Sequence, residues 1–250
     1  MAKKVLIPIP NVDFDPTETG VPWKILTKAG VKVIFATPSG SIGRCDERML
    51  NGIGLGPLAD LLAADKNGRE AYREMSQSEE FKNPINWGDI DTAIYDGLIL
   101  PGGHAQGMRE YLESEALQSC VGKFFELNKP VGAICHGVVL ASRSQKLDGR
   151  SVLFGRKTTA LLGIQEMSAW LLTCLWLGDY YRTYPQTVES EVKSSLYSEK
   201  DFIKGTTPLF RDSPKKLSNG FTVQDGNYLS ARWPGDAHLF GNRFLKMLAD

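Results

Sequence analysis

The chain has 250 residues, 42% of them hydrophobic, which is enough to bury one large α/β core or two small ones. Its 29 basic residues balance 29 acidic ones, and no basic run with interleaved aromatic residues is present, so we expect neither nucleic acid nor a membrane as a partner. No apolar stretch is long enough for a signal peptide or a bilayer span. Four scattered cysteines without CxxC spacing favour free thiols, which predicts a cytoplasmic protein.

Short apolar runs that favour strands alternate along the chain with runs of helical spacing. The expected strands are 5–9, 31–37, 97–100, 131–134 and 158–162, followed by a hairpin of 222–224 and 228–231. The expected helices are 21–28, 116–127, 138–141, 164–175 and 240–248. Strands that alternate with helices predict an α/β fold, in which helices cover both faces of a mostly parallel sheet and sites lie at the carboxyl ends of strands.

Two polar segments, 40–93 and 179–220, interrupt this alternation. The first is rich in Gly, Asp and Glu and has helical pieces near 58–62 and 70–75, whereas the second is irregular. No internal repeat or long linker divides the chain, so we expect a single domain over residues 1–250. Insertions of this length cap a functional site or form a subunit interface, and the sequence does not choose between the two.

Residues 131–137, Val-Gly-Ala-Ile-Cys-His-Gly, combine a short apolar strand, a cysteine and small neighbours. Ala133 and Gly137 lie two positions to either side of Cys135, and an apolar helical run follows. This pattern predicts a nucleophile elbow, a sharp strand-to-helix turn that displays a reactive side chain and has room only for small neighbours. A helix N-terminus favours the thiolate, and His136 is a candidate proton carrier. The alternative is a buried structural cysteine beside a surface histidine.

Two more candidates lie at the ends of neighbouring expected strands. The strand 97–100 ends in Pro101-Gly102-Gly103-His104, where paired glycines let backbone N–H groups turn toward an oxyanion. Glu18 lies in the loop 11–19, just before a helix with Pro22 in its first turn. A carboxyl group held near a thiolate is desolvated and repelled, so its pKa rises as a general acid or base requires. The alternatives are an ordinary turn and a solvated loop carboxylate.

The chain resembles the ThiJ/PfpI superfamily in three segments, 18–30, 96–104 and 133–137. This group includes the Parkinson-associated deglycase and has the class I glutamine amidotransferase-like fold. The resemblance therefore implies a flavodoxin-like three-layer α/β sandwich, here with two insertions. The segment 40–93, with Trp87 before Asp96, is most similar to the larger branch of heat-shock chaperones and glutathione-independent glyoxalases.

The resemblance implies a role for each matching residue. Cys135 corresponds to the family's nucleophile, His136 to its histidine and Glu18 to its conserved glutamate. The loop Gly102-Gly103-His104 corresponds to its anion-binding segment, in which backbone N–H groups of Gly103 and His136 stabilise an oxyanion.

The larger branch also has an acidic residue that orients the histidine, about thirty residues after the cysteine. This residue corresponds to Glu166, for which a simple helix first-turn acid is the alternative. The segment 231–238 departs from the branch's usual pattern of small residues. Arg232, Asp236 and His238 are therefore candidates for shaping a different substrate pocket.

By this resemblance we expect cofactor-free conversion of a small 2-oxoaldehyde, such as methylglyoxal, to a hydroxy acid. A cysteine amidase or peptidase-like hydrolase and a redox-sensing or chaperone-like stress protein are alternatives, because all three need the same reactive cysteine. Three histidines lack paired ligand spacing, so we expect no metal and no cofactor. We expect a homodimer, with Trp170 and Trp176 in the core or at the dimer interface.

Overall fold

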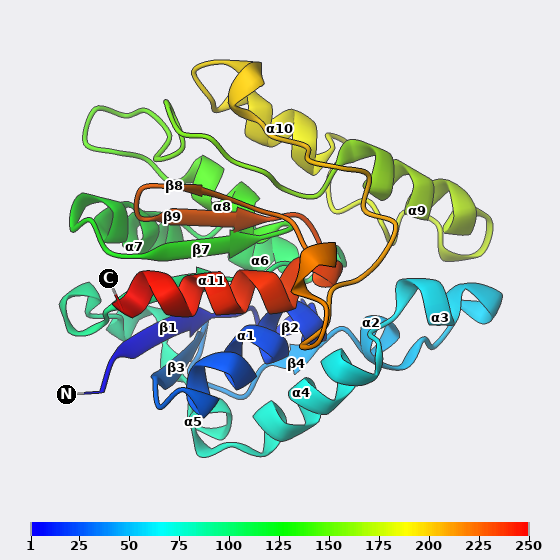
Figure 1. Ribbon diagram of the computed structural model, residues 1–250, viewed down its shortest axis with the longest axis horizontal. Coiled ribbons are helices and arrows are strands. Elements are labelled where there is room, and N and C mark those ends of the chain that lie inside the picture. The colour runs from blue at the N-terminus through cyan, green and yellow to red at the C-terminus, as the bar shows by residue number, and fades with distance from the viewer. Residues whose placement is uncertain (1, 250) are drawn as a thin grey trace.

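The computed structural model of this chain describes residues 2–249 and is built around a seven-stranded sheet (Figure 1). All neighbouring strands are parallel except the last pair, which forms the expected hairpin. The predicted α/β, flavodoxin-like fold is confirmed. The strands run in the order β5 (Ile85–Asn86), β3 (Lys32–Thr37), β1 (Lys4–Pro8), β6 (Gly97–Leu100), β7 (Val131–Ile134), β9 (Tyr228–Ala231) and β8 (Thr222–Asp225).

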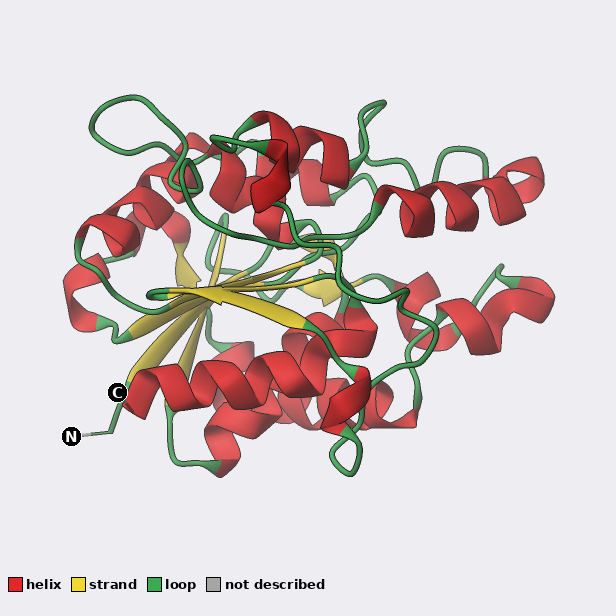
Figure 2. Cartoon of the chain, turned by 45° about the horizontal axis from the view of Figure 1, so that its top comes forward, coloured by secondary structure: helices red, strands yellow, loops and turns green. Residues whose placement is uncertain are grey.

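Helices cover both faces of this sheet, as Figure 2 shows from a second direction. On one face, α1 (Pro16–Lys28) packs against α11 (Ala237–Ala249) and against α4 (Lys66–Gln77). The other face carries α6 (Met108–Leu112), α7 (Glu115–Glu126) and α8 (Gly137–Arg143). The three layers leave the carboxyl ends of the parallel strands as the edge where connecting loops meet.

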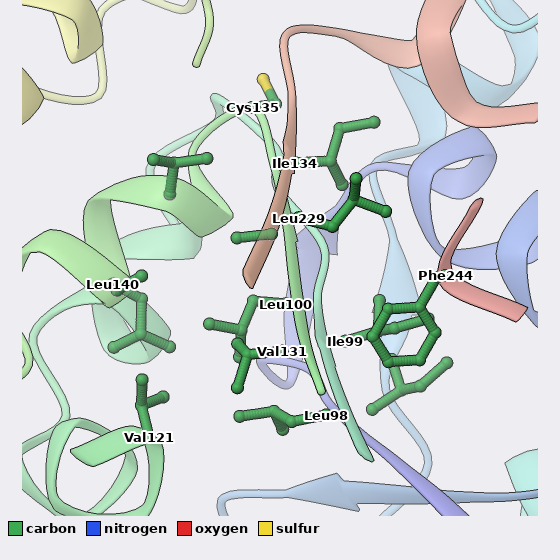
Figure 3. Close-up of a cluster of buried hydrophobic side chains, with 14 of the residues drawn as sticks. Leu98, Ile99, Leu100, Val121, Val131, Ile134, Cys135, Leu140, Leu229 and Phe244 are labelled. Carbon is green, nitrogen blue, oxygen red and sulfur yellow. The ribbon is translucent and has the colours of Figure 1, made fainter. Parts of the chain in front are cut away.

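The central strands are buried on both faces, which is why β6 and β7 are continuous apolar runs without alternation. Side chains of α7 and α8 pack on one side of them and Phe244 of α11 on the other (Figure 3). Each large apolar side chain buried in this way contributes about 1.5–3 kcal/mol to stability. The same figure shows Cys135 beyond the end of β7, where the apolar core stops.

Helix α1 begins five residues earlier than the sequence pattern predicted, at Pro16 instead of Val21. The Asp15 carboxylate caps its N-terminus by accepting hydrogen bonds from the N–H groups of Thr17 (2.8 Å) and Glu18 (2.9 Å). Pro16 occupies the first helical position, where its missing N–H costs nothing. The prediction that Glu18 lies in a loop is therefore wrong, since it belongs to the first turn of α1.

The strand expected at 158–162 is also not formed. Thr158 makes a single bridge to Phe202, and the N–H of Thr159 donates to Ser230 Oγ at 3.0 Å. Strand β9 already pairs with β7 on one side and with β8 on the other, so it offers no free edge to a further strand. The apolar pattern of 158–162 reflects burial against the sheet.

The two insertions contain more helix than the sequence indicated. The first packs onto α1 through α4, and its strand β4 (Arg44–Cys45) pairs with β2 (Val12–Phe14) near the carboxyl end of β1. The second begins at the end of α9 (Gly163–Leu177), a helix that extends away from the sheet in both Figures 1 and 2. Within residues 2–249, none of the helices has both the length and the apolar character needed to cross a membrane.

The remaining elements are β2 (Val12–Phe14), β4 (Arg44–Cys45), α2 (Glu47–Asn51), α3 (Ala59–Leu62), α5 (Glu79–Lys82), α9 (Gly163–Leu177) and α10 (Val188–Ser194), with 3₁₀ turns at Gly56–Leu58, Trp87–Asp89, Thr92–Ile94, Glu199–Asp201, Leu217–Asn219 and Pro234–Asp236.

Candidate active site

Cys135 occupies a sharp turn between β7 and α8, in the backbone geometry of a nucleophile elbow. Its φ of +57° is a left-handed conformation that is uncommon for a residue with a side chain. The turn is held by a hydrogen bond from the Cys135 N–H to the Ala231 carbonyl (3.1 Å), and a side chain at Gly137 would overlap the Leu100 carbonyl oxygen. The thiol is only 4% exposed.

Glu18 and Gly102 lie next to this thiol, because β1, β6 and β7 are neighbours in the sheet. The Gly102 N–H donates to Glu18 Oε2 at 2.9 Å, and the Asp15 N–H donates to the Gly102 carbonyl at 2.8 Å. A side chain at Gly102 would lie 2.7 Å from Glu18 Oε2 and 2.9 Å from Cys135 Cβ. Only glycine fits between the carboxyl group and the cysteine.

Burial controls the ionisation of both groups. Desolvation raises the pKa of Glu18 well above its usual range, and the Asp15 carboxylate raises it further, so the site favours the protonated form of Glu18. Desolvation also raises the pKa of Cys135, and a charge on Glu18 would raise it more. Two neighbouring buried acids cannot both ionise readily. Burial of Cys135 therefore opposes the thiolate that a helix N-terminus was predicted to favour.

His136 links the thiol to a second side chain. Its Nδ1 lies 3.5 Å from Cys135 Sγ, and its Nε2 lies 3.1 Å from Thr183 Oγ1. Thr183 donates its own hydroxyl proton to the His104 carbonyl at 2.5 Å, so it accepts the hydrogen bond from His136 Nε2–H. The Nδ1 lone pair then faces the thiol. Burial lowers the pKa of His136 to about 3, with charges on His104 and Arg143 as smaller causes, so the ring is a neutral proton acceptor.

Glu166 does not make the contact expected of it. Its Oε2 accepts a hydrogen bond from the Val188 N–H (2.9 Å), and its Oε1 lies 3.8 Å from Arg182 Nε. Burial raises the pKa of Glu166 to about 7. Among the described residues the ring of His136 has Cys135 and Thr183 as partners, because Glu166 projects from the first turn of α9 toward the start of α10. Thr183 makes the contact with the His136 ring that was predicted for Glu166.

The segment 178–187, which we call the strap, crosses over the site. Arg109 donates to the Thr183 carbonyl from Nε (2.9 Å) and Nη2 (2.6 Å), and Gln106 Nε2 donates to the Arg182 carbonyl at 3.0 Å. Tyr180 Oη donates to Asp46 Oδ2 at 2.5 Å, which ties the strap to the first insertion. The second insertion therefore caps the site, one of the two roles left open above. Thr183 was not predicted from the sequence, because a threonine in an irregular segment belongs to no recognisable catalytic motif.

The loop Gly102-Gly103-His104 lies between Cys135 and the strap. The His104 ring stacks on Tyr181 with centroids 4.4 Å apart and meets the edge of Tyr180 at 4.9 Å. Burial lowers the pKa of His104 to about 4, and its Nε2 is buried without a hydrogen-bond partner. Within residues 2–249, the Gly103 N–H donates to no backbone carbonyl.

The residues expected to shape a different pocket do not line this site. Arg232 and Asp236 form a fully buried ion pair, with two hydrogen bonds of 2.9 Å between their side chains. Arg232 also donates to the Thr206 carbonyl at 2.6 Å, and Asp236 accepts from the Phe221 N–H at 2.9 Å. A buried ion pair needs hydrogen bonds for its remaining polar atoms as well. Through these bonds the pair attaches the second insertion to the sheet. His238 lies elsewhere, in a groove between α1, α4 and α11.

The other three cysteines lie away from the site. All four thiols are free. Burial raises the pKa of Cys45 and Cys120 to about 12, as expected of packing thiols, and Cys174 is half-buried on α9. Across the described chain, no group of three or more His, Cys, Asp or Glu side chains is arranged to hold a metal ion.

Comparison with known proteins shows which family this chain is similar to. Residues 9–200 match the family model described as ThiJ/PfpI family-like. The deglycase PfpI of Pyrococcus furiosus is 27% identical over 167 residues, which are 67% of this chain and 70% of that protein. The glutathione-independent glyoxalase hsp3102 of Schizosaccharomyces pombe is 26% identical over 60% of each chain. Two other curated relatives are matched over 46% and 31% of their own length, so the chain spans less than half of them.

Solved structures agree on the fold. The crystal structure of glyoxalase III from Candida albicans superposes with a TM-score of 0.71 at 19% identity, and covers 98% of this chain and 97% of that one. Drosophila melanogaster DJ-1beta gives a TM-score of 0.58 at 15% identity, with 100% and 91% coverage. At these identities the likeness concerns the fold alone.

Proposed function

This chain belongs to the ThiJ/PfpI family, and from that premise we propose that it converts small 2-oxoaldehydes of the methylglyoxal type to hydroxy acids. The observation that carries the proposal is that a carboxyl group and an imidazole lie on either side of one cysteine thiol. A protonated carboxyl (Glu18), a thiol (Cys135) and a neutral imidazole (His136) supply an acid, a nucleophile and a base without a cofactor. The printed functions of the two relatives, deglycase and glyoxalase, are consistent with this substrate class.

The first step forms a carbon–sulfur bond. Cys135 sulfur adds to the aldehyde carbon while His136 Nδ1 takes the thiol proton and Glu18 gives its proton to the carbonyl oxygen. The product is a hemithioacetal, and the site now holds a Glu18 carboxylate and a His136 imidazolium. The free N–H of Gly103 stabilises the oxygen as negative charge develops there.

The next steps move a hydrogen between the two carbons. Glu18 takes the proton from the former aldehyde carbon, and His136 protonates the neighbouring ketone oxygen, which gives an enediol. Glu18 then protonates the second carbon while His136 takes back a hydroxyl proton, which leaves a thioester on Cys135. Water attacks the thioester carbon and gives one proton to Glu18, and the departing sulfur takes the proton from His136. The net change is addition of water, with one carbon oxidised and its neighbour reduced.

We further propose that the chain works as one domain in the cytoplasm, where a reducing environment keeps Cys135 as a thiol. The same three groups also suit an acyl-enzyme hydrolase, so the test must separate the two chemistries. A panel of 2-oxoaldehydes, amides and nitriles is assayed with wild type, Cys135→Ala and the matched control Cys120→Ala, which removes another buried thiol. We expect turnover of 2-oxoaldehydes alone, abolished only in Cys135→Ala. Turnover of amides or nitriles alone would contradict the proposal and identify a hydrolase.

A further inference from the structure

Helix α9 (Gly163–Leu177) is apolar on its outer side as well as on its inner side. Its inner side buries Glu166 and Thr173 and packs Trp170 and Leu177 against a small apolar cluster. Its exposed large side chains are also apolar, and Leu175 is 93% exposed. A surface helix of a monomer normally turns its apolar stripe inward and a polar face outward. The missing polar face indicates that the outer side of α9 packs against something outside this chain.

The outward apolar side chains form one surface, which we call the α9 patch. They recur at intervals of three or four residues, the spacing of a helix seam that meets another helix. Trp176 Nε1 donates to the Gly54 carbonyl at 2.9 Å, so the exposed Ile53 lies beside the patch. The members of the patch are Ile164, Met167, Leu171, Leu172, Leu175 and Trp176.

The size of the α9 patch fits half of a protein interface. With about 150–200 Å² for a fully exposed large side chain, the exposed fractions correspond to about 600 Å². This equals the upper end of the largest apolar patch on ordinary monomers, about 300–600 Å². Ile53 and Leu61, both exposed on the neighbouring segment, bring the area close to the roughly 800 Å² that each partner contributes to a standard interface.

The charges around the patch favour a second copy of this chain as its partner. Glu166 is the only charged residue of α9, and it is buried. In a twofold dimer the same patch meets itself, which an uncharged surface tolerates and a charged one does not. A helix that lies on a membrane instead carries many Lys and Arg side chains along its polar face, and α9 has none.

We propose that two copies of this chain dock through their α9 patches about a twofold axis. The expectation of a homodimer from the sequence named no surface, and the apolar outer side of α9 supplies one. The inference does not depend on the chemistry proposed for Cys135. It does place the interface next to the active site, because α9 continues directly into the strap that carries Thr183.

The test compares two equally exposed leucine surfaces. Sedimentation velocity of the full chain is measured from low to high micromolar concentration for wild type, for Leu171→Glu/Leu175→Glu and for the control Leu147→Glu. Leu147 is also 93% exposed, but it lies in the loop after α8. We expect wild type and the control to sediment as dimers, and the double variant as a monomer, with its dimer dissociation constant raised at least about 100-fold.

Circular dichroism of the double variant should match wild type, since both substituted side chains point outward. A wild-type protein that stays monomeric throughout would overturn the proposal, and so would a folded double variant that remains dimeric. Wild type is also tested for flotation with phosphatidylserine–phosphatidylcholine vesicles. Monomeric wild type that floats with the vesicles would assign the α9 patch to a membrane and equally overturn the proposal.

Discussion

The strand-end half of the site, formed by Glu18, Gly102 and Cys135, is held by the backbone of three neighbouring strands and the helices that follow them. The strap half, formed by Tyr180 and Thr183, belongs to an irregular segment. Hydrogen bonds that involve side chains hold this segment over the site. In the proposed mechanism, the strand-end half contains the atoms that form and break bonds with substrate. The strap half positions the ring of His136 and closes the site over it. We therefore expect changes in the first half to remove activity and changes in the second to reduce it.

The largest effect in this comparison is expected for Glu18→Gln. The substitution keeps the shape and the contact with Gly102 but removes the carboxyl proton that takes part in four transfers of the proposed mechanism. Positioned proton transfer is typically worth about 10²–10⁴ in rate, so kcat should fall by that factor. A matched control is Glu47→Gln, which changes another first-turn acid behind an aspartate cap, on exposed α2. Loss of less than about tenfold in Glu18→Gln would contradict its role.

The pH profile tests the ionisation of His136. Burial lowers its pKa to about 3, so the ring is protonated only below that value and is a neutral acceptor at every higher pH. We expect kcat/KM to stay flat between about pH 5 and 8, with no decrease on the acid side near the ordinary histidine pKa of about 6.5. An acid limb near pH 6.5 that disappears in His136→Gln would show that the ring is solvated in the working enzyme.

A smaller effect is expected for Thr183→Val in the strap half. Valine keeps the shape but leaves His136 Nε2 and the His104 carbonyl without their hydroxyl partner. An unpaired buried polar group costs about 1–3 kcal/mol, so we expect kcat to fall roughly tenfold while KM changes little. Thr183→Ser restores the hydroxyl and should restore kcat. Equal loss in both variants would mean that packing, and not the hydrogen bond, is what matters at this position.

The smallest effect is expected for Tyr180→Phe, which removes the hydrogen bond between the strap and Asp46. One hydrogen bond contributes about 0.5–1.5 kcal/mol to stability, and its loss should lower the free energy of unfolding in urea by that amount. We expect kcat to change less than in Thr183→Val, because Tyr180 does not contact His136. A loss of activity as large as that of Glu18→Gln would place the strap among the groups that do the chemistry.

Local pattern was enough to predict the strand-end half. An elbow needs a strand, a small residue on each side of the nucleophile and a helix, and all of these are neighbours of Cys135 in the sequence. The start of α1 was predictable too, since Asp15-Pro16 is a recognisable cap and first-turn signal.

The other errors share one physical cause, which is that they depend on distant parts of the chain. The pattern of 158–162 is apolar, but nothing local says that both edges of β9 are already paired. Counting from Cys135 placed an acid at Glu166, whereas the side chain that meets His136 comes from Thr183, 47 residues away. Likewise, the apolar run of α9 predicted a helix but not that the leucines would face outward.

The most direct test of the account is to trap the bond that it places on Cys135. Wild-type protein is mixed with methylglyoxal in chelator without added cofactor, quenched in acid during turnover, digested and analysed by mass spectrometry. The account predicts one hydroxyacyl group on the peptide that contains Cys135, removable by hydroxylamine as a thioester, and neither adduct nor product in Cys135→Ser. Continued turnover by Cys135→Ser, or turnover by wild type with Cys135 never modified, would contradict it.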